Sequence, residues 1–258
     1  FFTAMPYENL SDQDHTYDEA IQNNKAFASW VKRSVHLHKQ KGYRAITLSL
    51  KPHGLAPGDA TSAQMRTVAE LADLYSFGEL RVSHEQNLIL ADVKLQDIFK
   101  VWEKAKAHQL ATPNIGLLTD IICCPGGDFC SLANAKSIPI ATSIQEAFDN
   151  LDYLHDIGEL ELNISGCMNA CGHHHIGHIG VLGVDKDGSE WYQVTIGGKQ
   201  GNDASLGSVI GPSFAAEEMP GVVKKLIDVY IKHRNPEERF IDTVRRLGVN
   251  PFKEHVYA

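Results

Sequence analysis

The sequence of 258 residues lacks several features that would assign it to common classes of protein. It has no run of about 20 apolar residues, so it predicts no membrane-spanning helix. It has no surplus of positive charge: 24 Lys and Arg against 32 Asp and Glu give a formal net charge of −8. Nucleic-acid binding relies on clustered Lys and Arg, so this balance argues against nucleic acid as a partner. The first fifteen residues lack the basic and apolar regions of a secretion signal, which favours a cytoplasmic protein.

Cysteine is scarce and unevenly placed. There are five cysteines, an odd number, and without a secretion signal this indicates a reducing compartment and thiolate chemistry rather than disulfides. Four of them form two pairs, Cys124-x5-Cys130 and Cys167-x3-Cys171, each in a turn that contains glycine. Cys123 lies at the end of an apolar run and is interpreted as a small buried hydrophobic residue.

Two such pairs of thiolates suit a single soft metal centre. Structural zinc sites usually separate their paired cysteines by two to four residues, so the wider first spacing favours an iron–sulfur cluster, with zinc as the alternative. Several histidines follow the last cysteine and also invite a metal interpretation. We favour the alternative that their rings pack against a cofactor edge or face solvent. These histidines are His173, His174, His175 and His178.

The first half of the chain predicts an α+β layer of the ferredoxin-like kind. Alternation predicts strands, helical spacing predicts helices, and Thr61 with Gln64 forms a capping box that opens a helix. The expected order is strand, helix, strand, strand, helix, over residues 43–50, 61–75, 79–83, 88–93 and 95–108. Arg81 is expected to form an ordinary salt bridge rather than an anion site.

Residues 112–114 break this pattern and mark a subdomain boundary. The expected domains are a linker or arm over 1–40, a ferredoxin-like half-domain over 41–113 and a mixed α/β domain over 114–258. In the last of these, strands over 117–122 and 160–165 deliver the two cysteine pairs. The other expected elements are a helix over 131–151 interrupted near Pro139, strands over 176–184 and 191–196, and helices over 214–233 and 236–247.

Together these motifs resemble one known family. CPGGDFC at residues 124–130 and GCMNACG at residues 166–172 look like the signature of sulfite and nitrite reductases that carry sirohaem and a [4Fe–4S] cluster. Residues 58–90 are similar to the ferredoxin-like half-domain of that family. Within the family, the resemblance is greatest to the haemoprotein (beta) component of bacterial assimilatory sulfite reductases.

The resemblance implies roles for individual residues. The sulfur of Cys171 matches the ligand that bridges the cluster to the sirohaem iron as its axial ligand. Asn169 matches an asparagine beside the macrocycle, and Gln86 and Asn87 match a turn that faces the sirohaem. The residues that match the cluster ligands are Cys124, Cys130, Cys167 and Cys171.

The resemblance covers only the second half of the family chain and the linker before it. In the family, most Arg and Lys residues that hold the substrate anion and the sirohaem carboxylates come from the first half. The catalytic residues are therefore unknown here, and the N-terminal half is an implied partner without which this part is expected to be inactive.

The implied reaction is the six-electron reduction of sulfite to sulfide, with electrons from an NADPH-dependent flavoprotein or from ferredoxin. Reduction of nitrite to ammonia is the alternative. A cofactor-free fragment or a structural metal-binding module is the second alternative.

Overall fold

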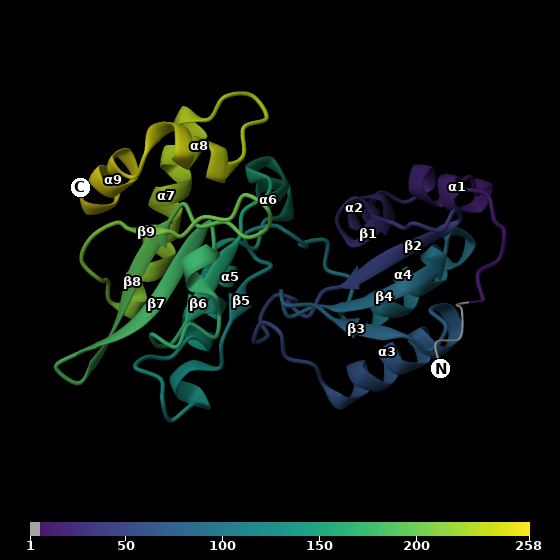
Figure 1. Ribbon diagram of the computed structural model, residues 1–258, viewed down its shortest axis with the longest axis horizontal. Helices are drawn as coiled ribbons and strands as arrows, with labels where there is room; N and C mark the ends of the chain where they lie inside the picture. The colour runs from purple at the N-terminus through teal and green to yellow at the C-terminus, as the bar shows by residue number, and fades with distance from the viewer. Residues whose placement is uncertain (1–5) are drawn as a thin grey trace. The chain divides into compact units, whose positions relative to one another are not determined.

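The computed structural model describes residues 6–258 and divides them into two compact units (Figure 1). Unit 1 contains the described residues up to Pro52 together with Gly58–Ile115, and unit 2 contains His53–Pro57 and Gly116–Ala258. Each unit has a hydrophobic core of its own. Among the described residues, no helix combines the length and the apolar character that crossing a bilayer requires.

Unit 1 is an antiparallel sheet packed with helices, and in its described part the strand order is β1-β2-β4-β3. The order of elements predicted for residues 43–108 is confirmed, and the structure adds the edge strand β1. The strands are β1 Val35–Leu37, β2 Tyr43–Leu48, β3 Leu80–Val82 and β4 Leu88–Lys94. The helices are α1 His15–Asn23, α2 Lys25–Ser34, α3 Ser62–Tyr75 and α4 Ile98–Ala107.

The local sequence explains where the helices of unit 1 begin and which faces they bury. The capping box is present: Thr61 accepts from the backbone of Gln64, and the Gln64 side chain accepts from the backbone of Thr61. In its described part, the segment 1–40 is not the linker or arm that the sequence predicts. Its helix α2 buries Phe27 and Trp30 completely or almost completely in the core of unit 1, so these apolar residues belong to the domain.

Unit 2 is built on a mixed sheet, and over its described residues the strand order is β5-β6-β7-β8-β9. Strands β5, β6 and β7 are parallel, whereas β7 and β8 form an antiparallel hairpin. The strands are β5 Ile122–Cys123, β6 Leu162–Ser165, β7 Ile179–Lys186, β8 Ser189–Ile196 and β9 Ser208–Val209. The helices are α5 Ile138–Ala147, α6 Leu151–Ile157, α7 Met219–His233, α8 Phe240–Leu247 and α9 Asn250–Tyr257.

Two expectations for unit 2 are corrected by the structure. The helix expected over 131–151 begins only at Ile138, because Pro139 lies in the first turn of α5, where its missing N–H costs nothing. Pro139 therefore starts this helix and does not interrupt it. The strand expected over 117–122 is reduced to the short β5, and the C-terminal helix α9 was not predicted.

Candidate functional site

The two cysteine turns leave neighbouring parallel strands of unit 2. In the β5–β6 pair, Cys123 is opposite Ile164, and the backbone N–H of Cys124 donates to the Ile164 carbonyl at 3.1 Å. Parallel strands end at the same edge of a sheet. The turn after β5, which starts at Cys124, and the turn after β6, which carries Cys167, therefore lie side by side.

Hydrogen bonds join the two turns directly. The N–H of Gly166 donates to the Cys124 sulfur at 3.1 Å. In return, the Gly166 carbonyl accepts from the N–H groups of Asn134 and Ala135, at 2.8 and 3.0 Å. A change in the position of one turn would break these bonds to the other, so the positions of the turns are coupled.

Glycine makes this close approach possible. A Cβ atom at residue 166 would lie 2.6 Å from the carbonyl oxygen of Ala135 and 2.9 Å from the Cα of Gly126. Gly126 itself has a φ of 57°, in the left-handed region that favours glycine. The glycines of the two motifs thus have a packing role.

The candidate ligands differ in exposure. Cys124 and Cys167 are buried, each with 7% of its surface exposed, whereas Cys130 is half-buried and Cys171 is exposed. All the cysteines lie in the described residues, and none of them forms a disulfide. Cys123 is buried at 4% exposure, and its thiol donates to the Cys124 carbonyl, in agreement with its interpretation as a small core residue.

The structure brings the two turns together but does not gather the sulfurs into a finished ligand set. Within residues 6–258, no group of three or more Cys, His, Asp or Glu side chains is placed to hold a metal ion. The donor set nevertheless fits an iron–sulfur cluster: four thiols lie on two hydrogen-bonded turns, and the Cys124 sulfur already accepts the N–H bond that a thiolate ligand favours.

Large apolar side chains stand exposed around the cysteines. Phe129 and Leu132 flank Cys130 with 80% and 71% of their surface exposed, and Met168 follows Cys167 with 83% exposed. Exposed apolar side chains of this size beside candidate ligands are typical of a surface that binds another group.

The three other residues that the family resemblance singles out belong to different units. Asn169 is exposed in the second cysteine turn, next to Ala170, whose φ is 55°. Gln86 is partly exposed in unit 1 and has a φ of 58°, whereas Asn87 is buried at 1% exposure. The Asn87 side-chain oxygen accepts from the N–H of Leu50 at 3.1 Å, so Asn87 helps to hold the turn that carries Gln86.

The histidines divide into two exposed and two buried rings, and the two buried ones correct the expectation that all would face a cofactor or solvent. His173 and His175 are exposed, whereas His174 and His178 have 5% of their surface exposed. Desolvation by burial lowers the pKa of each buried ring to about 4, because a charged ring would lose its hydration. Both buried rings are therefore neutral at pH 7.

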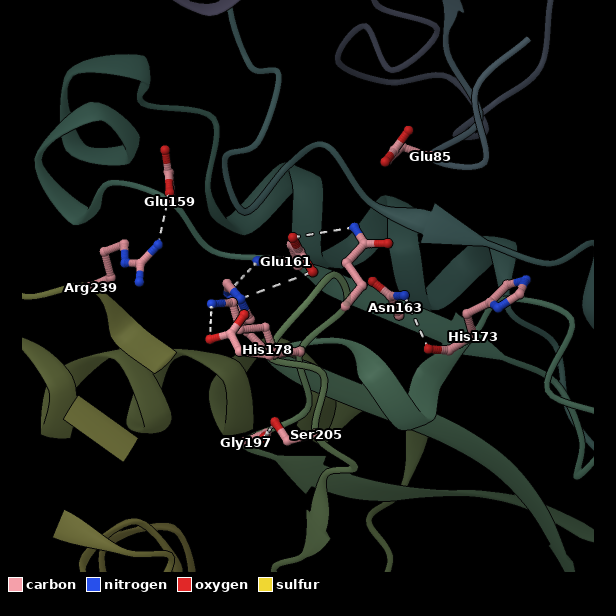
Figure 2. Close-up of polar contacts among 12 residues, drawn as sticks. Glu85, Glu159, Glu161, Asn163, His173, His178, Gly197, Ser205 and Arg239 are labelled. Atoms are coloured by element: carbon pink, nitrogen blue, oxygen red, sulfur yellow. Dashed lines mark hydrogen bonds and ion pairs between the residues drawn. The ribbon is translucent and has the colours of Figure 1, made fainter. Parts of the chain in front are cut away.

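His178 belongs to a polar network at the ends of the strands opposite those that lead to the cysteines (Figure 2). Its Nδ1 accepts the N–H of Glu161 at 3.1 Å, and its Nε2 lies 4.0 Å from a Glu161 carboxylate oxygen. Arg239 lies 3.9 Å from Glu159 and 2.7 Å from Asp242. Paired charges and a neutral ring make this network a structural feature.

Arg81 pairs with Glu79 at 2.5 Å, which confirms the expected salt bridge. The site also contains a residue that the sequence did not single out: Ser137, fully buried beside the Cys124 sulfur. The sequence did not predict that Ser137 lies beside this sulfur, because serine before a helix is common and usually indicates only a helix start.

The fold and the cysteine turns define the class: a ferredoxin-like half-domain followed by a mixed α/β domain whose thiols fit an iron–sulfur cluster. Residues 117–258 match the model of the nitrite and sulphite reductase 4Fe-4S domain, and residues 36–108 match the nitrite/sulfite reductase ferredoxin-like half domain. The chain belongs to the nitrite and sulfite reductase family. The family binds sirohaem and a [4Fe–4S] cluster, and the chain contains its 4Fe–4S domain.

Curated relatives include enzymes for both anions. The chain is 29% identical over 209 residues to the assimilatory ferredoxin-dependent nitrite reductase of Haloferax mediterranei, covering 78% of this chain and 35% of that protein. It is 21% identical over 210 residues to the assimilatory-type sulfite reductase of Nitratidesulfovibrio vulgaris, covering 80% of this chain and 88% of that protein. The chain thus spans about a third of the nitrite reductase but most of the shorter sulfite reductase.

Solved structures agree on the fold. The Mycobacterium tuberculosis NirA protein superposes with a TM-score of 0.67 at 22% identity, covering 84% of this chain and 41% of that one. Dissimilatory sulfite reductase I superposes with a TM-score of 0.68 at 14% identity, covering 84% of this chain and 69% of that one.

Proposed function

We propose that this chain supplies the [4Fe–4S] cluster and the axial thiolate of a sirohaem enzyme that reduces a small oxyanion by six electrons. The observation that carries the proposal is the pair of hydrogen-bonded cysteine turns at adjacent strand ends. The proposed cluster ligands are Cys124, Cys130, Cys167 and Cys171.

The chain's own residues have distinct tasks in this proposal. The buried sulfurs of Cys124 and Cys167 would hold the cluster, and the hydrogen bonds between their turns would fix the positions of both sulfurs. The exposed Cys171 would ligate the cluster and offer its sulfur to the sirohaem iron. When bound, the sirohaem supplies an iron with an open face for the anion.

The turns would hold the cluster beside the exposed apolar side chains of Phe129, Leu132 and Met168. Asn169 and the turn of Gln86 and Asn87 are proposed to bind the macrocycle, with Asn87 acting by holding Gln86 in position. We expect the cations that bind the anion to come from outside this chain. The acidic net charge of the chain agrees with this expectation.

Sulfite is the proposed anion, with nitrite as the second candidate. A relative of comparable length is named a sulfite reductase, and the chain covers 88% of it. The longer relatives named ferredoxin–nitrite reductases are more similar in sequence, at 29% identity. Steady-state rates with both anions, measured on the enzyme with its complete complement of partners, decide between the two. A higher kcat/KM for nitrite would refute sulfite as the substrate.

Those nitrite reductases are named for ferredoxin, which supports ferredoxin as an electron donor; an NADPH-dependent flavoprotein is the competing donor. Reduction rates measured with each donor distinguish the two candidates.

The bridging role of Cys171 is tested by Cys171→Ser in the holoenzyme. Serine removes the soft sulfur that would join the cluster to the haem iron, so we expect the magnetic coupling between the two centres to disappear. Cys123→Ala is the matched control, because Cys123 is a buried thiol in the same region that is not a proposed ligand. Coupled spectra that persist in Cys171→Ser would contradict the assignment.

The alternative of a structural metal-binding module makes a different prediction. A chain that carries zinc, no iron and no sirohaem absorption would favour that module over the reductase.

A further inference from the structure

Ser137 occupies the N-cap position of α5 but does not perform the usual task of an N-cap serine. Serine is favoured there because its hydroxyl accepts a hydrogen bond from a backbone N–H in the first turn. The Ser137 side chain makes no such bond. Its hydroxyl is therefore directed elsewhere, although the side chain is fully buried.

The hydroxyl faces the Cys124 sulfur. The Ser137 Oγ lies 3.4 Å from Cys124 Sγ. A Cβ atom added to Gly126 or Gly166 would come within 2.6 and 3.0 Å of this oxygen, so the two glycines enclose it. The first turn, the second turn and the start of α5 thus meet at one sulfur.

We propose that Ser137 donates a hydrogen bond to the Cys124 sulfur and thereby raises the reduction potential of the cluster. The inference rests on the proposed function, in which Cys124 is a cluster ligand. A ligating thiolate has no proton to give, so the hydroxyl must be the donor. The Gly166 N–H, at 3.1 Å from the same sulfur, is a second donor.

The direction of the effect follows from charge. Reduction adds one electron to the cluster from an external reductant; no bond breaks, and Ser137 keeps its proton. The electron makes the ligand sulfurs more negative, and hydrogen bonds to those sulfurs stabilise the more negative state. The N-terminus of α5, with its partial positive charge, acts in the same direction. Ser137 is therefore a positioning residue that tunes electron acceptance.

The test is Ser137→Ala in the full chain carrying its cluster, with the midpoint potential measured by a dithionite titration followed by electron paramagnetic resonance. At a fixed potential we expect the ratio of reduced to oxidised cluster to fall by about threefold to tenfold. A tenfold fall corresponds to a midpoint about 59 mV lower for one electron. Ser143→Ala is the matched control, since the Ser143 hydroxyl donates to the Ile140 carbonyl within the same helix. The control should keep the wild-type potential.

The outcomes separate this inference from the proposed function. A wild-type chain that binds no iron–sulfur cluster would overturn the proposed function and the inference with it. A wild-type chain with a cluster, and a Ser137→Ala chain with the same potential, would overturn the inference alone. A Ser137→Ala chain that is folded but loads no cluster would also overturn it, because Ser137 would then be required for assembly.

Discussion

The two edges of the parallel strands in unit 2 are built in opposite ways. At the edge where β5 and β6 end, glycine turns carry two buried and two more exposed thiols, together with exposed apolar side chains that include Phe129 and Met168. At the edge where β6 and β7 begin, Arg239 pairs with Glu159 and Asp242 near the neutral ring of His178. Strands of one sheet thus end in a surface that offers ligands and begin in a network whose charges are paired.

This difference shows how one sheet separates binding from stability. Burial of His178 as a neutral ring and pairing of the nearby charges stabilise the fold without any ligand. The cysteine edge is held by backbone bonds through Gly166, which fix the turns while leaving sulfurs available. Changes at the two edges should therefore have different consequences.

The largest expected effect is a loss of folding stability at acid pH, caused by His178. The unfolded ring titrates near 6.5, whereas burial lowers the pKa of folded His178 to about 4. Between these values the unfolded chain takes up a proton that the folded chain refuses, so stability falls as the pH drops from 6.5 to 4. The loss from this ring is about 3 kcal/mol, and above pH 6.5 it contributes no slope.

Denaturant unfolding of the cofactor-free chain at a series of pH values measures this loss. His174 titrates with the same sign in the same window, so His178→Asn should remove only part of the slope. The exposed His255 provides the control variant His255→Asn. A slope unchanged by His178→Asn would contradict the account. The charged groups that act on His178 are Arg239, Lys199, Asp242 and Arg245, with Glu161 in contact.

A smaller effect on stability is expected at the cysteine edge. Gly166→Ala introduces a Cβ into the space of Ala135 and Gly126, and overpacking of this kind costs about 2 kcal/mol. The two cysteine turns must move apart to make room for this Cβ atom, so iron binding should fall as well. Gly221→Ala, in α7 with open space around it, is the control and should be neutral or slightly stabilising. Full iron binding by Gly166→Ala would break the comparison between the edges.

The smallest expected effect is a change in the pKa of His178. Desolvation is the main cause of the low pKa of His178, and the nearby Arg239 cation lowers it further. Arg239→Gln should therefore raise the pKa of His178 by a fraction of a unit, visible in a titration of the ring followed by nuclear magnetic resonance. Arg234→Gln, which loses a pair with Asp156, should leave the ring unchanged. A fall in the pKa of His178 would contradict this assignment.

Local sequence rules predicted much of the fold. The capping box at Thr61 identified the start of α3, and alternation identified the strands around it. These signals lie within a few residues of the elements they control. The start of α5 was misjudged, because Pro139 can either break a helix or open one, and only the packing of the preceding loop decides.

The candidate site was predictable to the level of its cysteines and no further. Their spacing indicated the candidate ligands, which stay a prediction, but the burial of His178 and the direction of the Ser137 hydroxyl depend on residues distant in sequence. Ser137 contacts a sulfur thirteen residues away and is enclosed by a glycine of the second turn. No local pattern encodes such a contact.

The most direct test is the iron and acid-labile sulfide content of the anaerobically purified full-length protein. The account predicts about four acid-labile sulfides and about five iron atoms per chain, four in the cluster and one in the sirohaem. The sulfides and the cluster iron should be lost in Cys124→Ser and retained in Cys123→Ala. A protein that holds zinc with no iron or sulfide, or that keeps its full iron and sulfide content in Cys124→Ser, would contradict it.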